Sequence, residues 1–193
     1  MKKLTRQDLY SLEQYAEQRS DIRKEVMAHK QARRISLGDH LRLLFEDRIT
    51  IHYQVQEMLR AERIFEASGI QDELDAYNPL IPDGDNLKAT LLIEYDDVAQ
   101  RQAALARLKG IEDKVWVQIG EEKVFAIADE DLERENDEKT SSVHFLRFQF
   151  DRKVGDRLAA GAGISFGVDH DHYSARHAAT DVQRRSLQQD FAG

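Results

Sequence analysis

The sequence predicts an α+β fold, with N-terminal helices followed by a mainly antiparallel or mixed sheet that carries helices on one face. Apolar residues recur at helical spacing near the N-terminus and again over residues 48–67. Residues 88–168 instead alternate between strand-like and helix-like segments, in an order typical of split β-α-β units. The chain has 193 residues, of which 41% are hydrophobic, so it can bury a core of its own.

The first part begins with two predicted helices. Thr5 and Ser20 are suitable N-caps, and the short link between the two segments predicts a helical hairpin. Two strand-like segments follow at residues 34–38 and 40–46. Residues 48–67 fit both a strand alternation and a longer helical stripe. The helix formers in this run favour a helix from about residue 48 to near residue 69, followed by a shorter helix at residues 71–76.

A stiff loop separates this part from the next. Pro79 and Pro82 fix two φ angles within residues 77–86, and a Pro-Asp-Gly turn follows. We therefore expect a helical or mixed part over residues 1–86 and a sheet part over residues 87–173, together forming one compact domain. Residues 174–193 are polar and aperiodic and are expected to be a mobile tail.

The second part is expected to form one sheet over residues 88–168, with both of its helices on a single face. The expected strands are residues 88–95, 115–119, 123–127, 143–150 and 163–168. The expected helices are residues 97–109 and 153–160. The acidic segment 129–139 is expected to be a short helix or a solvated loop. The strands 115–119 and 123–127 form a hairpin across a Gly-Glu-Glu turn.

Composition excludes several classes of protein. The chain has no cysteine, so disulfides, thiolate zinc sites, a cysteine nucleophile and an iron–sulfur cluster on its own cysteines are ruled out. It lacks an apolar run of about 20 residues and its start does not resemble a secretory signal, so we expect a cytoplasmic protein without a membrane partner. The net charge is −8, and the basic residues at 23–34 are expected to form a solvated helix face, so nucleic acid is not an expected partner.

One candidate site lies on the predicted helix over residues 48–67. Glu62 interrupts its apolar stripe, where a carboxylate needs an ionic partner, such as Arg48 or Arg147, or a metal. His52, one turn from Gln56, lies near Glu57 on the same segment. A structural ion pair at the edge of the core is the alternative to a functional site.

Three histidines are candidate metal ligands. His170 and His172 alternate with aspartates, and such a run can offer nitrogen and oxygen ligands to Zn²⁺, Fe²⁺ or Mn²⁺ if His144 or Glu62 completes the set. The alternative for the pair is a solvated strand end. The alternative for His144, which shares a strand face with apolar residues, is a hydrogen-bonded core position.

Four runs of the sequence are informative when taken together: residues 38–48, 53–62, 78–84 and 143–148. They resemble a bacterial protein family, domain of unknown function 3501, and the resemblance covers about residues 1–173. Members of that family are often encoded near rubrerythrin and an iron–sulfur oxidoreductase, which implies a redox or peroxide-defence setting. The resemblance also singles out a set of polar positions where a site could be built, together with the loop 78–84: Gln54, Gln56, Glu57, Arg60 and Glu62.

Two functional hypotheses follow. The first is a cytoplasmic accessory or interaction protein whose partner is rubrerythrin or an iron–sulfur oxidoreductase; a homo-oligomer is also possible. The second is a small enzyme that depends on a divalent transition metal, in which case the catalytic candidates are Glu57, Glu62, His52 and Arg60. Whether the protein is an enzyme, and which cofactor it would use, stays open at this point.

Overall fold

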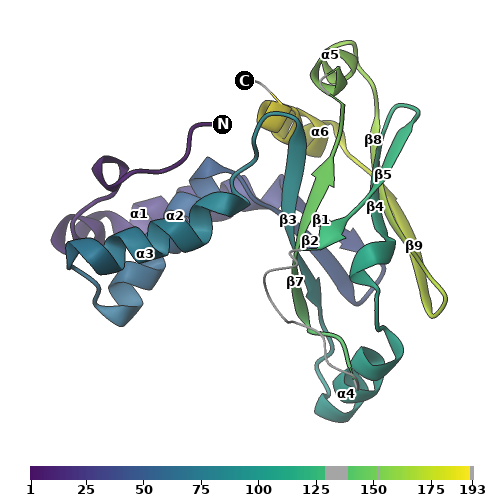
Figure 1. The fold of residues 1–193 in the computed structure, drawn as a ribbon, viewed down its shortest axis with the longest axis horizontal. Helices are drawn as coiled ribbons and strands as arrows, with labels where there is room; N and C mark the ends of the chain where they lie inside the picture. The colour runs from purple at the N-terminus through teal and green to yellow at the C-terminus, as the bar shows by residue number, and fades with distance from the viewer. Residues whose placement is uncertain (129–138, 152, 192–193) are drawn as a thin grey trace.

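A computed structural model describes residues 1–128, 139–151 and 153–191. It confirms the predicted α+β class, because these residues form α-helices together with two antiparallel sheets (Figure 1). The helices are α1 (Leu12–Gln31), α2 (Arg48–Glu62), α3 (Ala67–Tyr77), α4 (Val98–Arg107), α5 (Val154–Ala159) and α6 (Asp181–Gln188), with short 3-10 turns at Arg6–Asp8, Asn78–Leu80, Glu112–Lys114 and Gln189–Phe191.

The two sheets each combine strands from distant parts of the chain. The first has the order β1 (Arg34–Leu37), β2 (Leu41–Phe45), β3 (Asn86–Ile93), β7 (Val143–Gln149) and β6 (Ile127–Ala128). The second has the order β5 (Glu122–Phe125), β4 (Val115–Ile119), β8 (Ile164–His170) and β9 (Tyr173–Ala178). All neighbouring pairs are antiparallel, so each strand can present alternate residues to a shared core.

The main core lies between the two sheets. Leu43 of β2 pairs with Leu91 of β3, and both are fully buried, as are Val117 and Phe166 of the second sheet. The rings of Phe45 and Phe166 meet across the core with their centroids 5.3 Å apart. The alternation of buried and exposed residues along these strands is what fixes their register, because a shift by one residue would turn the apolar set outward.

Helices α1, α2 and α3 form a second unit, here called the helical arm, which projects to one side of the sheets (Figure 1). Its core is separate and consists mainly of α2 residues packed against α3 and the N-terminal segment: Leu4, Ile51, Val55, Leu59, Leu74 and Ile81. Helix α1 packs on α2 and buries only Tyr15 and Val26 of its 20 residues. The arm therefore exposes most of α1 to solvent.

A buried arginine joins the arm to the sheets. Arg33, 1% exposed, follows α1 and donates to the backbone oxygens of Phe45 and Glu46 at the end of β2. Its guanidinium also lies 2.5 Å from Asp190 at the end of the chain. Burial raises the pKa of Asp190 to about 6, although the charge and hydrogen bond of Arg33 oppose that shift.

Asp47 extends this network to α2. Its carboxylate caps the helix by accepting from the backbone N–H groups of Ile49 and Thr50, and it lies 2.5 Å from His29 of α1. Burial acts against ionisation of Asp47, yet the hydrogen bond with His29 and the charge of Arg33 lower its pKa overall. The end of α1 and the start of α2 are thus fastened to the same polar cluster.

Several expectations about the helices are wrong. Residues 12–31 form one continuous helix rather than a hairpin, because the segment contains neither glycine nor proline. A serine at an exposed helix position, such as Ser20, lowers helix stability only slightly. Helix α2 begins at Arg48 as predicted but ends at Glu62, where Arg63 adopts a left-handed conformation with φ 56°. Helix α3 then starts earlier than predicted, at Ala67.

The expectation of one sheet over residues 88–168 is also wrong. Its strands are divided between the two sheets, with β3 and β7 in the first and β4, β5 and β8 in the second. Helices α4 and α5 lie at opposite ends of the paired sheets and do not share one face (Figure 1). Local alternation identifies strands but not their partners, and β1 and β2 join β3 across the expected boundary at residue 86.

The predicted mobile tail is an ordered part of the fold. Residues 173–191 form β9, α6 and a final 3-10 turn, and Leu187, Asp190 and Phe191 are buried. The sequence conceals this because Val182 and Leu187 are the only large apolar residues of α6, and of the two only Leu187 is buried. Apart from residue 139, the acidic segment expected at residues 129–139 lies outside the described residues. Among the described residues, the structure contains no helix with the length and apolar character needed to cross a membrane.

Replacement of Gly167 by alanine tests the packing of the second sheet. The Trp116 indole packs against Gly167, and a Cβ atom added there would lie 2.1 Å from the nearest ring atom. We expect Gly167→Ala to lower the free energy of unfolding by about 1–3 kcal/mol through overpacking. Gly163→Ala is the matched control, because no atom lies within 4 Å of its added Cβ. Equal urea midpoints for the two variants would contradict the packing described here.

Candidate binding site on the helical arm

The N-terminal residues 4–11, here called the strap, run along the helical arm and are held by one polar stripe of α2. Arg48, His52 and Gln56 lie one turn apart on this helix, so their side chains share a face. Arg48 lies 2.6 Å from the Asp8 carboxylate, and His52 Nε2 donates to the Asp8 carbonyl at 2.8 Å. The Gln56 side-chain oxygen accepts from the Tyr10 backbone N–H at 2.7 Å.

These contacts make the strap a fixed element rather than a loose terminus. Burial lowers the pKa of His52, which favours the neutral imidazole that donates to Asp8. At the other end of the strap, the Asn78 side chain bonds both the N–H and the carbonyl of Leu4, at 2.8 and 3.0 Å. The stiff loop predicted at residues 77–86 thus helps to anchor the strap.

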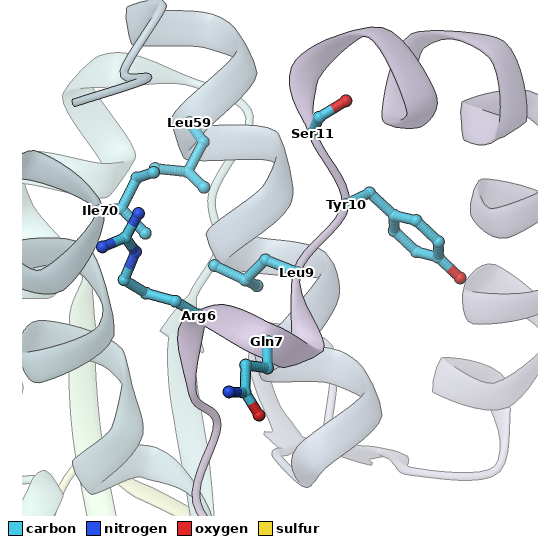
Figure 2. A pocket seen from close by; sticks show the side chains of 7 residues that line it. All are labelled: Arg6, Gln7, Leu9, Tyr10, Ser11, Leu59 and Ile70. Atoms are coloured by element: carbon cyan, nitrogen blue, oxygen red, sulfur yellow. The ribbon is translucent and has the colours of Figure 1, made fainter. Parts of the chain in front are cut away.

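A pocket of about 490 Å³ lies between the strap and helices α2 and α3. Its apolar side is made by Leu9, Leu59 and Ile70, and Figure 2 shows the Arg6 side chain extending toward Ile70. Gln7, Tyr10 and Ser11 complete the lining, while the Tyr10 ring points away from the leucines (Figure 2). Sequence reasoning missed this pocket because its residues come from three separate segments; the capping signal at Thr5 was the only local hint of an ordered strap.

Glu57 belongs to a polar cluster on the α1 side of α2. Arg19 binds its carboxylate with two nitrogens at 2.7 Å, and the buried Tyr15 hydroxyl donates to it at 2.7 Å. The Arg19 hydrogen bonds lower the pKa of Glu57 to about 2, against the effect of burial. Tyr15 and Arg19 of α1 both bind the Glu57 carboxylate of α2, so the cluster is a structural link between the two helices.

Glu62 does not have the buried position predicted for it. Its side chain is exposed because α2 ends at this residue, and Arg60 is exposed beside it. The partners expected for Glu62 are engaged elsewhere, Arg48 with Asp8 and Arg147 with Gln149. The structure brings Glu57 and His52 onto different faces of α2, and Arg60 and Glu62 onto the exposed end of the arm.

The predicted metal ligands are far from that helix in the fold. The His144 side chain is only 3% exposed. Its Nε2 atom shares a hydrogen bond of 2.9 Å with Thr140 Oγ1 and lies 3.8 Å from the Glu112 carboxylate. His170 and His172 are at the turn between β8 and β9, with ring centroids 5.7 Å apart. Over the described ranges, no group of three or more metal-ligating side chains is assembled, so a metal site at these histidines stays a prediction.

The loop 78–84 binds two lysines that lie outside it in the sequence. Asp83 bridges Lys3 and Lys88, each at 2.7 Å, and Lys88 Nζ also donates to the Pro79 carbonyl. Burial lowers the pKa of Lys88, while the two ammonium groups lower the pKa of Asp83 despite its partial burial. This cluster ties β3 and the residue that precedes the strap to the loop, and its geometry is that of a structural contact.

Substitution of Glu57 tests whether it links α1 to α2. We expect Glu57→Gln to lower the free energy of unfolding by about 1–2 kcal/mol at pH 7, because Tyr15 and Arg19 lose a charged partner. The difference from wild type should persist above pH 4.5 and disappear as the pH falls toward 2, since the folded-state pKa of Glu57 is depressed. Urea unfolding across this pH range measures it.

Glu62→Gln is the matched control for this substitution. The side chain of Glu62 is exposed at the end of the same helix, so its replacement should change stability by no more than about 0.5 kcal/mol. If Glu62→Gln proved the more destabilising of the two, the assignment of Glu57 as the link would be wrong.

Comparison with known proteins agrees with this fold. A crystal structure from Burkholderia pseudomallei K96243, described as a novel protein of unknown function, has 54% sequence identity and a TM-score of 0.92. The similarity covers 98% of this chain and 99% of that chain. No curated protein matches. The model of the family described as protein of unknown function (DUF3501) matches residues 3–191, including the ordered C-terminal segment, and the chain therefore belongs to the DUF3501 family.

Proposed function

We propose that this protein is an accessory protein that docks on a redox enzyme, either rubrerythrin or an iron–sulfur oxidoreductase, through the end of its helical arm. This docking surface, here called the arm tip, consists of Arg60, Glu62, Arg63 and Phe65. The observation that carries the proposal is Phe65, which is 73% exposed and has the highest exposure among the large hydrophobic side chains of the described residues.

The backbone at the arm tip explains why Phe65 is presented outward. The left-handed conformation of Arg63 reverses the chain after α2, and the next N–H, from Ile64, donates to the Leu59 carbonyl. Ile64 then packs against the core of the arm, whereas Phe65 is left in solvent. A non-glycine residue with positive φ is uncommon and persists only where the surrounding structure supports it.

The composition of the arm tip is that of a protein-binding surface. Aromatic residues and arginines are enriched at interfaces and account for much of their binding energy when they are buried by a partner. Phe65 offers the aromatic group, and the exposed Arg60 and Arg63 precede it in the sequence. In this proposal the predicted site residues Arg60 and Glu62 act as contacts of the partner.

The redox character of the partner rests on the family setting implied by the sequence resemblance. Because this chain has no cysteine, an iron–sulfur cluster held by thiolates would have to belong to the partner. An accessory role needs only a rigid surface, and the arm provides one through the ion pairs and hydrogen bonds that join α1, α2 and the strap.

Binding of the purified protein to purified rubrerythrin and to the iron–sulfur oxidoreductase of the same organism tests the proposal. We expect saturable binding to one of them, weakened about tenfold or more by Phe65→Ala, since loss of a hot-spot aromatic costs about 2 kcal/mol or more. Biolayer interferometry with the full-length chain measures the dissociation constants.

Val98→Ala is the control, because Val98 is also largely exposed, at 54%, but lies on α4 at the far end of the sheets. It should bind like the wild type. The proposal fails if neither redox enzyme binds, or if Phe65→Ala and Val98→Ala bind equally well.

A further inference from the structure

We propose that the pocket beneath the strap is a binding site for a small ligand that combines an apolar body with a single negative charge. This site is distinct from the arm tip and does not depend on a protein partner. Its volume, about 490 Å³, lies within the range of small-molecule sites, which are mostly apolar with a few placed polar groups.

The apolar part of the ligand follows from the three aliphatic side chains that line the pocket. Leu9 comes from the strap, Leu59 from α2 and Ile70 from α3. Leu59 is 2% exposed and part of the arm core, so this wall is rigid. Leu9 and Ile70 are partly exposed, so a ligand that covers them gains the free energy of removing their apolar surface from water.

The negative charge follows from Arg6. Within the part of the chain that the structure describes, the Arg6 guanidinium has no side-chain hydrogen bond or ion pair, and the pocket lining contains no carboxylate. The nearest acid in sequence, Asp8, is already bound to Arg48. An arginine at the edge of an apolar pocket complements a carboxylate or sulfonate, with which it forms charge-assisted hydrogen bonds.

The strap makes the pocket preformed. Contacts with His52, Gln56 and Asn78 hold its backbone on both sides of Arg6 and Leu9. A ligand therefore does not have to order this segment, and the entropic cost of binding is reduced. Such tethering distinguishes the pocket from a chance hollow beside a mobile terminus.

The probe for this site is 8-anilinonaphthalene-1-sulfonate, whose naphthalene and phenyl rings form an apolar body that carries one negative charge. Its neutral counterpart is N-phenyl-1-naphthylamine, which has the same rings without the sulfonate. Fluorescence titration of the full-length chain should give saturable binding of the anionic probe. Methyl resonances of Leu9, Leu59 and Ile70 should shift in the same titration, which locates the probe in this pocket.

Arg6→Gln should raise the dissociation constant of the anionic probe about fivefold or more while leaving that of the neutral probe unchanged, because only the charge-assisted contact is lost. The control is Arg185→Gln on α6, an exposed arginine far from the pocket, which should bind both probes like the wild type.

Three results would overturn the assignment. One is a wild-type protein whose Leu9, Leu59 and Ile70 methyl resonances do not respond to the anionic probe. Another is an Arg6→Gln variant that binds this probe as tightly as Arg185→Gln does. The last is displacement of the bound probe by rubrerythrin or the oxidoreductase, which would make the pocket part of a protein interface. The arm-tip proposal is judged separately, since Phe65 does not line the pocket.

Discussion

The ion pair between Arg33 and Asp190 is the interaction on which the arrangement of the molecule depends. Arg33 lies where α1 gives way to the first sheet, and its guanidinium also reaches the end of β2 and the C-terminal turn. Both side chains are buried almost completely, so each charge would be costly without the other. Through His29 and Asp47, the same cluster caps α2. One buried pair thus sets the direction in which the helical arm leaves the sheets.

That direction matters because both proposed binding surfaces are on the arm. The stripe of α2 that holds the strap shapes the pocket, and the end of the same helix presents Phe65. The polar residues of α2 act chiefly by positioning backbone: His52 and Gln56 fix the strap, and Glu57 fixes α1. His52, Glu57 and the side-chain oxygen of Gln56 are occupied with structural partners. In the two proposals, Arg6 is the group that meets the ligand and Phe65 is the aromatic group that meets the protein partner.

The sequence predicted most secondary elements but few of the contacts between them. The hairpin of β4 and β5 and the start of α2 were predicted, because alternation and capping are local signals. The division into two sheets and the ordered C-terminus were not, because they depend on pairing between distant strands and on the burial of Asp190. The exposure of Glu62 was missed for a different reason: α2 ends at this residue, and residue 63 carries no glycine to mark that end.

A double-mutant cycle on Arg33 and Asp190 tests the central claim most directly. Arg33→Met, Asp190→Leu and the double variant would be unfolded in urea at pH 7. We expect each single variant to lose about 3–5 kcal/mol, because a buried charge is left without its partner, and the double variant to recover much of that loss. The coupling energy should then exceed about 2 kcal/mol. Losses that add within about 0.5 kcal/mol would show that the two side chains stabilise the fold independently and that the arm is oriented by other contacts.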